Sequence, residues 1–429
     1  MRMRSHIILV IALWFQGYSV DAFANYSESA DKLSLAQLVS IGLSMSPEIQ
    51  AEKAKVQSAT TQIEIEKGGY WPSLQLSAGP ANGLYGDLSY DAALSQMLYD
   101  WGEVDSNVDS AMAKKRQQIQ SLLVARSDSS LEIIEVCFNL YAAREKLKAI
   151  QYYQNALSSI YLLVADRFHS QFSDSSEVAK VLKSQAYAKE QWANTQGELY
   201  EAESLYRLLL RREPSTLPDF VEPIDIFEQL KLPEKLNEAI FHSPQYLKAK
   251  QEIDVAKSSV ENANATLKPR LVLQAETQRR EIGGVLTSDS SVAIRFQMEI
   301  SQGLSGYYRT ESTAQQVEAA RWNLQSVRRD LEREFNSNRE NKIALAQRLE
   351  ALKQQIKQSS ILVKTYKDQF VAGLKTVEDL LNSESEKFQL TTQLINASSE
   401  YQQIPYRTAS KLGMLNQLLS EQDGNRELY

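Results

Sequence analysis

The sequence predicts a mainly α-helical protein with a small β part, built from two equivalent halves, and three observations lead to this fold class. Two proline sites, Ser46-Pro47 and Trp71-Pro72, recur as Ser243-Pro244 and Lys268-Pro269 with the same 25-residue spacing. Each half also contains at least 65 residues without glycine or proline, and a pair of short segments in which apolar and polar residues alternate. A unit this long that recurs only once indicates a duplicated half rather than a solenoid array.

The two runs without glycine or proline predict unusually long helices. They extend over 103–167 and 307–372, and at 1.5 Å per residue each would reach roughly 100 Å. A helix of this length is several times the mean for globular proteins and requires a coiled-coil-like or repeat setting. The apolar stripe is narrow, because small and polar residues interleave with it. We therefore expect each long helix to pack edge to edge with neighbours.

Each long helix is expected to turn back at a polar loop and form a helical hairpin, over 103–213 and 307–412. The return helices are predicted over 176–213 and 376–404, the second ending before Pro405 because proline cannot continue a helix without losing a hydrogen bond. Neither return helix is long enough to line its partner alone. We expect the short helix after each Ser-Pro pair to stack end to end with the return helix and cover the rest.

Strand pairs are predicted over 72–101 and 269–304. The clearest strand places one apolar row on one face: Val292, Ile294, Phe296, Met298 and Ile300. Segments of about ten residues with one apolar and one polar face fit the wall of a transmembrane barrel, and they also fit an exposed hairpin on a soluble sheet. Four strands cannot close a barrel, and an open edge in lipid leaves backbone groups unpaired. If these strands lie in a membrane, several chains must pool them.

The first 24 residues read as a secretory signal peptide. Arg2 and Arg4 form a basic start, Ile7–Phe15 an apolar core, and Ala22-Phe23-Ala24 a cleavage site of small residues. The apolar run is too short to span a bilayer; the alternative is a buried hydrophobic N-terminus. We expect residues 1–24 to be removed and 25–429 to remain as the mature chain.

Composition narrows the class of protein further. The formal net charge is −7, and loss of residues 1–24 makes it −8, which argues against a nucleic-acid partner. No other stretch approaches 18 consecutive apolar residues, so no transmembrane helix is expected. The single cysteine, Cys137, lies in a helical pattern and is expected to be a packed residue without a disulfide. No cysteine follows the cleavage site, so N-terminal lipid attachment is not expected.

An enzyme is not expected. The only histidines are His6, His169 and His242, and His6 lies in the predicted signal peptide. The sequence contains no paired-histidine metal motif, no nucleophile elbow and no phosphate-binding glycine loop. We therefore expect no catalytic residue, no cofactor and no metal site.

Together the motifs resemble the TolC family of outer-membrane export ducts. The resemblance rests on the duplicated proline sites, the strand ends Ser95–Gly102 and Ser301–Gly306, and the hairpin tip Phe370–Leu381. It implies a homotrimer in the bacterial outer membrane, in which four transmembrane strands per chain complete one 12-stranded β-barrel. It also implies a long α-helical coiled-coil barrel that extends through the periplasm. Residues 25–213 and 234–429 would then be two repeats of a single duct protomer, and 214–233 the linker between them.

The resemblance also implies partners and a function. The duct would conduct substrates from an inner-membrane pump, of the ABC or another type, and a periplasmic adaptor (membrane fusion) protein to the exterior. The absent lipid-attachment cysteine and the strand end Leu98–Gly102 resemble ducts that serve type I protein secretion, including that of large adhesins. Multidrug or small-molecule efflux is the alternative, because one duct can serve several pumps. A non-porous periplasmic coiled-coil structural protein is a second alternative, although it leaves the strand pairs unexplained.

The resemblance places a periplasmic constriction, the channel gate, at the hairpin tips, where family members carry aspartates. Asp379 occupies the first such position, and Asn382 stands at the second, which removes one charged ring. Lys375 replaces an arginine that helps to hold the tip closed, and Lys180 lies near a position that is acidic in the family. Three symmetry-related Asp379 carboxylates would repel one another, and a hydrated cation would offset that repulsion. The alternative is that Asp379 and Lys375 are solvated charges at a helix start.

Overall fold

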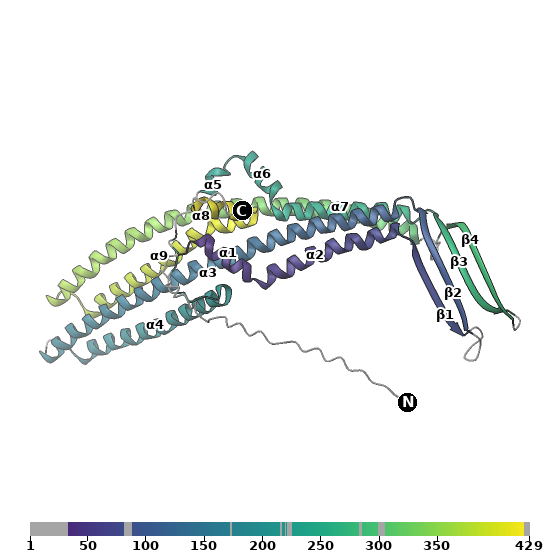
Figure 1. The fold of residues 1–429 in the computed structure, drawn as a ribbon. Helices are drawn as coiled ribbons and strands as arrows, with labels where there is room; N and C mark the ends of the chain where they lie inside the picture. The colour runs from purple at the N-terminus through teal and green to yellow at the C-terminus, as the bar shows by residue number, and fades with distance from the viewer. Residues whose placement is uncertain are drawn as a thin grey trace, which may run out of the picture.

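The computed structural model describes residues 33–80, 88–171, 174–214, 217–218, 220, 225–282, 285–298 and 305–423. The predicted signal peptide 1–24, a minor part of the predicted linker 214–233 and Ile300 of the apolar row lie outside the described residues. The molecule is elongated, with a β-sheet at one end and the turns of two helical hairpins at the other (Figure 1). Between them lies a thicker middle region of short helices.

The duplicated Ser-Pro pairs are helix starts. Helix α1 (Leu35–Met45) ends at Ser46, whose Oγ accepts a hydrogen bond from the Ile49 N–H at the start of α2 (Pro47–Lys67). The second repeat has the same arrangement, with α6 (Pro233–His242) followed by Ser243 and α7 (Pro244–Ala265). Serine satisfies an otherwise unpaired N–H group, and proline at the first helical position has no N–H to satisfy.

Two long helices extend through most of the molecule. Helices α3 (Glu103–His169) and α8 (Ser305–Val371) have 67 residues each. The return helices α4 (Ser175–Leu210) and α9 (Val377–Leu412) pack along them toward the tips. Toward the sheet, α2 and α7 pack along the same long helices, as the helix lengths predicted (Figure 1). Each long helix therefore has a short helix beside both of its ends.

The predicted end of the second return helix before Pro405 is wrong. Helix α9 continues through Pro405 to Leu412 and ends at Gly413, which has φ 73°. Pro405 removes one intrahelical hydrogen bond, but the neighbouring side chains of Ile404 and Tyr406 are each 1% exposed in the main core. Burial of these apolar side chains offsets the lost hydrogen bond. The first return helix ends earlier than predicted, at Leu210.

The main hydrophobic core lies in the middle region. It joins α1, α3, α4, α8 and α9 to the short helices α5 (Ile226–Gln229), α6 and α10 (Leu415–Asp423). Its largest fully buried side chains include Phe138 and Tyr406, with ring centroids 5.7 Å apart. Cys137 is fully buried in this core, and burial raises the pKa of its thiol to about 12, so it is a packed residue as predicted. The middle region therefore fixes the two repeats to each other.

The strands form one antiparallel sheet in the order β1-β2-β3-β4. Strands β1 (Ser73–Pro80) and β2 (Leu88–Tyr99) come from the first repeat, and β3 (Arg270–Ile282) and β4 (Val285–Gln297) from the second. The β2–β3 pairing joins the repeats, with Leu94 opposite Ala275. In the described part of the chain, β1 and β4 each have a strand on one side only.

The two faces of the sheet differ in chemistry. The register aligns Leu74, Leu94, Ala275 and Val292 in one row across all four strands. Val292, Ile294 and Phe296 on this face are 75%, 63% and 79% exposed. On the opposite face, Glu276 accepts hydrogen bonds from Arg295 at 2.9 Å and Ser291 at 3.1 Å. An exposed apolar surface of this extent marks contact with a membrane or another protein.

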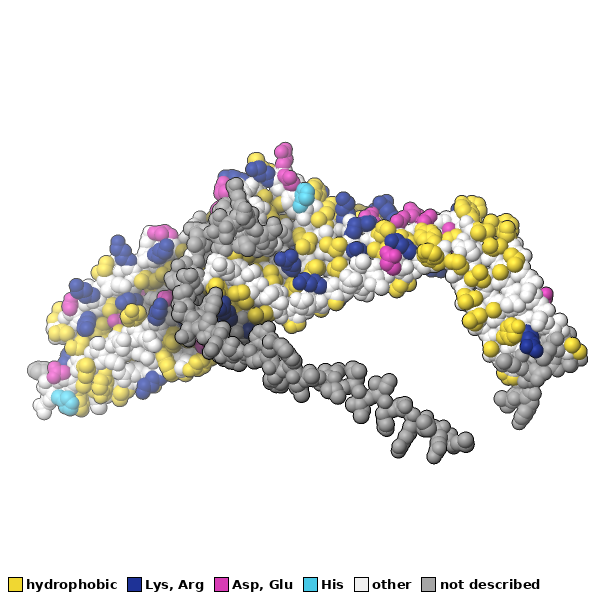
Figure 2. Space-filling model, in the orientation of Figure 1, with side chains coloured by type: hydrophobic (Ala, Val, Ile, Leu, Met, Phe, Trp, Pro, Cys, Tyr) yellow, Lys and Arg dark blue, Asp and Glu magenta, His cyan; other side chains and the backbone are white. Residues whose placement is uncertain are grey.

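Hydrophobic side chains cover much of the visible surface of the sheet end in Figure 2. Within the described ranges, by contrast, every helix falls short of the length and apolarity that crossing a bilayer requires.

Gly413 provides a test of the contact between the end of α9 and the start of α7. A Cβ atom at this position would lie 2.4 Å from Pro244 Cδ, and the residue has positive φ. Gly413→Ala should therefore lower the free energy of unfolding by about 2–4 kcal/mol through backbone strain and overpacking. At Gly197, in the exposed part of α4, an added Cβ atom would meet no other atom within 4 Å.

Gly197→Ala is the matched control, and it should raise stability by about 0.5–1 kcal/mol. Denaturation followed by circular dichroism measures both variants. Equal stability of the two alanine variants would contradict the close approach of Gly413 to Pro244.

Candidate functional site at the hairpin tips

The turns of the two hairpins lie side by side at the end of the molecule farthest from the sheet (Figure 1). A small core holds them together: α3 contributes Leu157 and Val164, α4 contributes Val181, α8 contributes Phe370 and α9 contributes Leu380. All these side chains are at most 1% exposed. The starts of α4 and α9, where three of the four predicted gate residues lie, are therefore fixed relative to each other.

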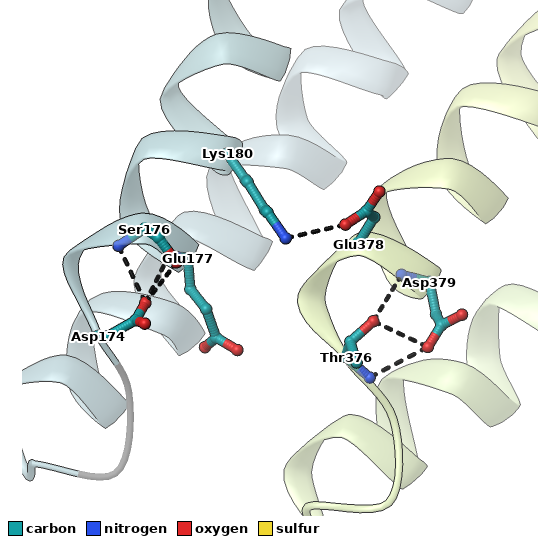
Figure 3. Close-up of polar contacts among 7 residues, drawn as sticks. All are labelled: Asp174, Ser176, Glu177, Lys180, Thr376, Glu378 and Asp379. Carbon is teal, nitrogen blue, oxygen red and sulfur yellow. Dashed lines mark hydrogen bonds and ion pairs between the residues drawn. The ribbon is translucent and has the colours of Figure 1, made fainter.

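Asp379 forms a capping box with Thr376. The Thr376 Oγ1 accepts a hydrogen bond from the Asp379 N–H at 3.2 Å, while Asp379 Oδ2 accepts from the Thr376 N–H at 3.2 Å and from its hydroxyl at 2.9 Å (Figure 3). These bonds hold the pKa of the Asp379 carboxyl below its ordinary value. Asp379 is therefore a fixed negative charge at the helix start.

Lys375 lies beside Asp379 in the second hairpin. Its Nζ is 3.7 Å from Asp379 Oδ1 and 4.4 Å from the centre of the Tyr366 ring. The ring of Tyr366, on α8, and the carboxylate thus hold the ammonium group between them. Lys375 is placed to neutralise part of the Asp379 charge within the second hairpin.

Lys180 pairs with a residue that the sequence alone did not indicate. Its Nζ donates a hydrogen bond to Glu378 Oε2 at 2.8 Å and so joins the start of α4 to the start of α9 (Figure 3). This contact raises the pKa of Lys180 and lowers that of Glu378. Glu378 was missed because the partners are 198 residues apart. The pair links the two hairpins across the tip.

A second link between the hairpins was also missed. Arg167, near the end of α3, donates a hydrogen bond from Nη1 to the Phe370 carbonyl at 2.8 Å, and its guanidinium lies 4.6 Å from the centre of the Phe370 ring. The sequence does show an arginine near one hairpin tip and an aromatic residue near the other. It contains no spacing that would predict their contact, because the two residues are 203 positions apart. Arg167 therefore fastens the end of α3 to the end of α8.

The first return helix begins next to Asp174. Asp174 Oδ1 accepts hydrogen bonds from the backbone N–H groups of Ser176 at 2.9 Å and Glu177 at 3.1 Å (Figure 3). The Ser176 hydroxyl, which also donates to this oxygen at 2.6 Å, and the two N–H groups hold the pKa of the Asp174 carboxyl below its ordinary value. The residue is the N-cap of α4.

Asn382 lies one turn after Asp379 on α9 and is exposed. Residues three apart lie on the same face of a helix, so the two predicted constriction residues share a face. The single chain brings Lys375 to Asp379 and Lys180 to Glu378. It does not bring Lys180 into contact with Asp379 or Asn382. Within the described residues, no three His, Cys, Asp or Glu side chains cluster in a way that could hold a metal ion.

The Lys180–Glu378 pair is exposed, with 48% and 62% of the two side chains accessible. Such pairs contribute little and are screened by salt. Lys180→Glu should therefore increase the population with separated hairpins by about two- to five-fold. Spin labels at the exposed positions Leu182 and Glu386, which lie on α4 and α9, measure the separation; buried Cys137 would remain unlabelled.

The charge-reversed pair Lys180→Glu with Glu378→Lys is the control, and it should restore the original distance distribution. A distribution unchanged in Lys180→Glu, or one that the double reversal fails to restore, would show that this pair does not link the hairpins.

Comparison with known proteins agrees with the duplicated architecture. The model of the outer membrane efflux protein family matches residues 38–209 and 236–408, one stretch in each repeat. No curated protein matches the sequence.

Solved outer-membrane channels have the same fold. The outer membrane protein VceC from Vibrio cholerae is 15% identical with a TM-score of 0.74, and the match covers 88% of this chain and 96% of that one. The Campylobacter jejuni CmeC outer membrane channel is 13% identical with a TM-score of 0.74, with 94% of each chain covered. The family match spans most of the chain, and the chain therefore belongs to the outer membrane efflux protein family, whose members are outer-membrane channel proteins and not enzymes.

Proposed function

We propose that three copies of this chain form one duct through the outer membrane. The observation that carries the proposal is the sheet: four strands with an exposed apolar face, a polar opposite face and a free edge on both β1 and β4 in the part of the chain that the structure describes. In lipid such edges must be paired, and three copies would pair them in a ring of twelve strands with the apolar faces outward. The helices α3 and α8 would then form the wall of a tunnel in the periplasm.

We propose that the duct accepts cargo from an inner-membrane pump through a periplasmic adaptor, and that the cargo is a protein of type I secretion. The resemblance of Leu98–Gly102 to ducts of that kind supports this cargo. In the structure, Asp100 accepts hydrogen bonds from the N–H groups of Gly102 at 3.0 Å and Val104 at 2.7 Å. The Trp101 indole N–H donates to the Pro269 carbonyl at 2.8 Å. The motif thus joins the sheet to α3 and one repeat to the other.

Small-molecule efflux is the second candidate, and the description of the matching family favours it. A deletion strain distinguishes the two. Protein secretion predicts that one or more large proteins disappear from the medium while sensitivity to drugs and bile salts stays unchanged. Efflux predicts that the secreted proteins stay unchanged while sensitivity to drugs and bile salts increases. Restoration by the plasmid-borne gene is the control, and the mass of the detergent-extracted complex tests the trimer separately.

We propose that the tips form the closed gate. The Asp379 side chains of the three copies would form one ring near the axis, with Asn382, Lys375 and Lys180 around it. The support is the rigid ionised carboxylate of Asp379 at a helix start, with Asn382 on the same face. The Lys180–Glu378 and Arg167–Phe370 links would hold the hairpins of each copy together in the closed state. Opening would break these contacts, which is feasible because the ion pair is exposed and weak.

The proposed gate predicts how cations block the duct. Asp379→Asn removes the charge while keeping a side-chain oxygen for the Thr376 N–H, so the helix cap is retained. Block of single-channel current by divalent or trivalent cations should weaken by about tenfold or more, because the substitution removes all three negative charges of the ring. Asn382→Asp should strengthen the block by adding a second ring, and Asn382→Ala should change it little.

Planar-bilayer conductance measures these effects. Equal block in the wild type and Asp379→Asn would locate the constriction elsewhere, at Lys180 or Lys375. Export should survive Asp379→Asn, because the open gate separates the three carboxylates.

A further inference from the structure

The exposed apolar face of the sheet changes character along the strands. The register gives successive rows that begin at the helices and end near the strand turns. The first rows are apolar, and they contain Leu271 with Phe296, then Leu273 with Ile294, then Ala275 with Val292. The next row pairs Thr277 with Ser290, and the row after it contains Tyr90, Arg279 and Ser288. An apolar surface therefore ends at a basic and aromatic row.

A notch of about 380 Å³ lies in the apolar part of this face. Most of its lining is apolar or uncharged, namely Leu74, Ala92, Leu94, Ala275, Thr277, Ser290 and Val292, and Glu276 and Ser291 complete it. The hydroxyls of Thr277 and Ser290 are hydrogen-bonded to each other at 2.9 Å. This bond uses one of the two hydroxyl protons within the pair and so leaves fewer unpaired polar groups in the notch. The notch is thus suited to a hydrocarbon chain.

Arg279 lies one row beyond the notch, directly opposite Tyr90. It is exposed, and none of the side chains that the structure describes forms an ion pair with it. Arg279 lies nine residues after Arg270, where β3 starts, and each residue of a strand advances about 3.4 Å. If the strand is tilted by about 40° from the membrane normal, Arg279 lies roughly 23 Å above Arg270 along that normal. The apolar band of a membrane barrel is about 25 Å tall. Arg279 and Tyr90 therefore fall where the far lipid headgroups begin.

We propose that the notch and Arg279 form a binding site for one acylated lipid with a phosphorylated headgroup in the outer leaflet. An acyl chain would lie in the notch, and a phosphate group would accept hydrogen bonds from the Arg279 guanidinium, which matches phosphate geometry. Tyr90 would lie at the headgroup level, where its ring and hydroxyl are both satisfied.

A second copy of the chain is not the occupant of this notch. Copies would join at the edges of β1 and β4, whereas the lining of the notch includes Ala92 on β2 and Ala275 on β3, between those edges. The surrounding medium for an outer-membrane protein is lipid, and the charge of Arg279 selects an anionic headgroup. The inference rests on the proposed placement of the sheet in the membrane.

The test measures lipid retained by the detergent-extracted complex in native mass spectrometry, with lipid A that carries two phosphates as the probe. Arg279→Gln and Ala275→Phe should each lower retention at least five-fold, the first by removing the charge and the second by filling the notch. Two variants are the matched controls and should change retention less than two-fold. Lys268→Gln removes a charge at the end of the sheet next to the helices, and Leu273→Phe adds bulk outside the notch.

Dephosphorylated lipid A should bind at least five-fold more weakly than lipid A, because it lacks the groups that Arg279 would bind. Equal retention by wild type, Arg279→Gln and Ala275→Phe would overturn the inference, as would equal retention of lipid A and dephosphorylated lipid A. The complex mass is read in the same spectra. A complex that assembles as a trimer without selective lipid therefore overturns this inference alone, whereas a soluble monomer overturns the proposed function.

Discussion

The requirement that backbone groups be paired in a non-aqueous medium governs the whole molecule. The sheet exposes apolar side chains on one face and, within the described residues, leaves β1 and β4 unpaired at its edges. Such a sheet is stable in lipid only if other copies complete it. Each long helix begins shortly after one strand pair. The short connection means that the arrangement of strands around a barrel also fixes the arrangement of the long helices that follow them. In the proposed trimer, the shape of the barrel therefore sets the shape of the helical tunnel.

Packing strength is distributed unevenly along the helices. In the middle region, α1, α5, α6 and α10 cover the long helices and bury large side chains such as Phe138 and Tyr406. At the tips the core is small, and the hairpins are joined by the exposed ion pair Lys180–Glu378 and by the contact of Arg167 with Phe370. Regions with few buried contacts open at low free-energy cost. The tips can therefore move while the middle region keeps the two repeats in register.

The two repeats use different local chemistry for the same geometry. The first hairpin starts its return helix with the Asp174 side chain as N-cap, and the second uses the Thr376–Asp379 capping box after Gly373 at φ 77°. Both solutions satisfy the N–H groups at a helix start. They leave different charges at the two tips, because the second adds Lys375 beside Asp379. The two repeats therefore share a fold, while their tip surfaces differ.

Local signals in the sequence determined much of the architecture. Ser-Pro pairs predict helix starts, absence of glycine and proline predicts long helices, and alternation predicts strands; these depend on neighbours along the chain. Only the tertiary structure decided that α9 continues through Pro405, because burial of Ile404 and Tyr406 outweighs one lost hydrogen bond. It likewise decided that Glu378 meets Lys180 and that Arg279 lies beyond the notch, since residues far apart in sequence meet only when helices pack and strands pair in register.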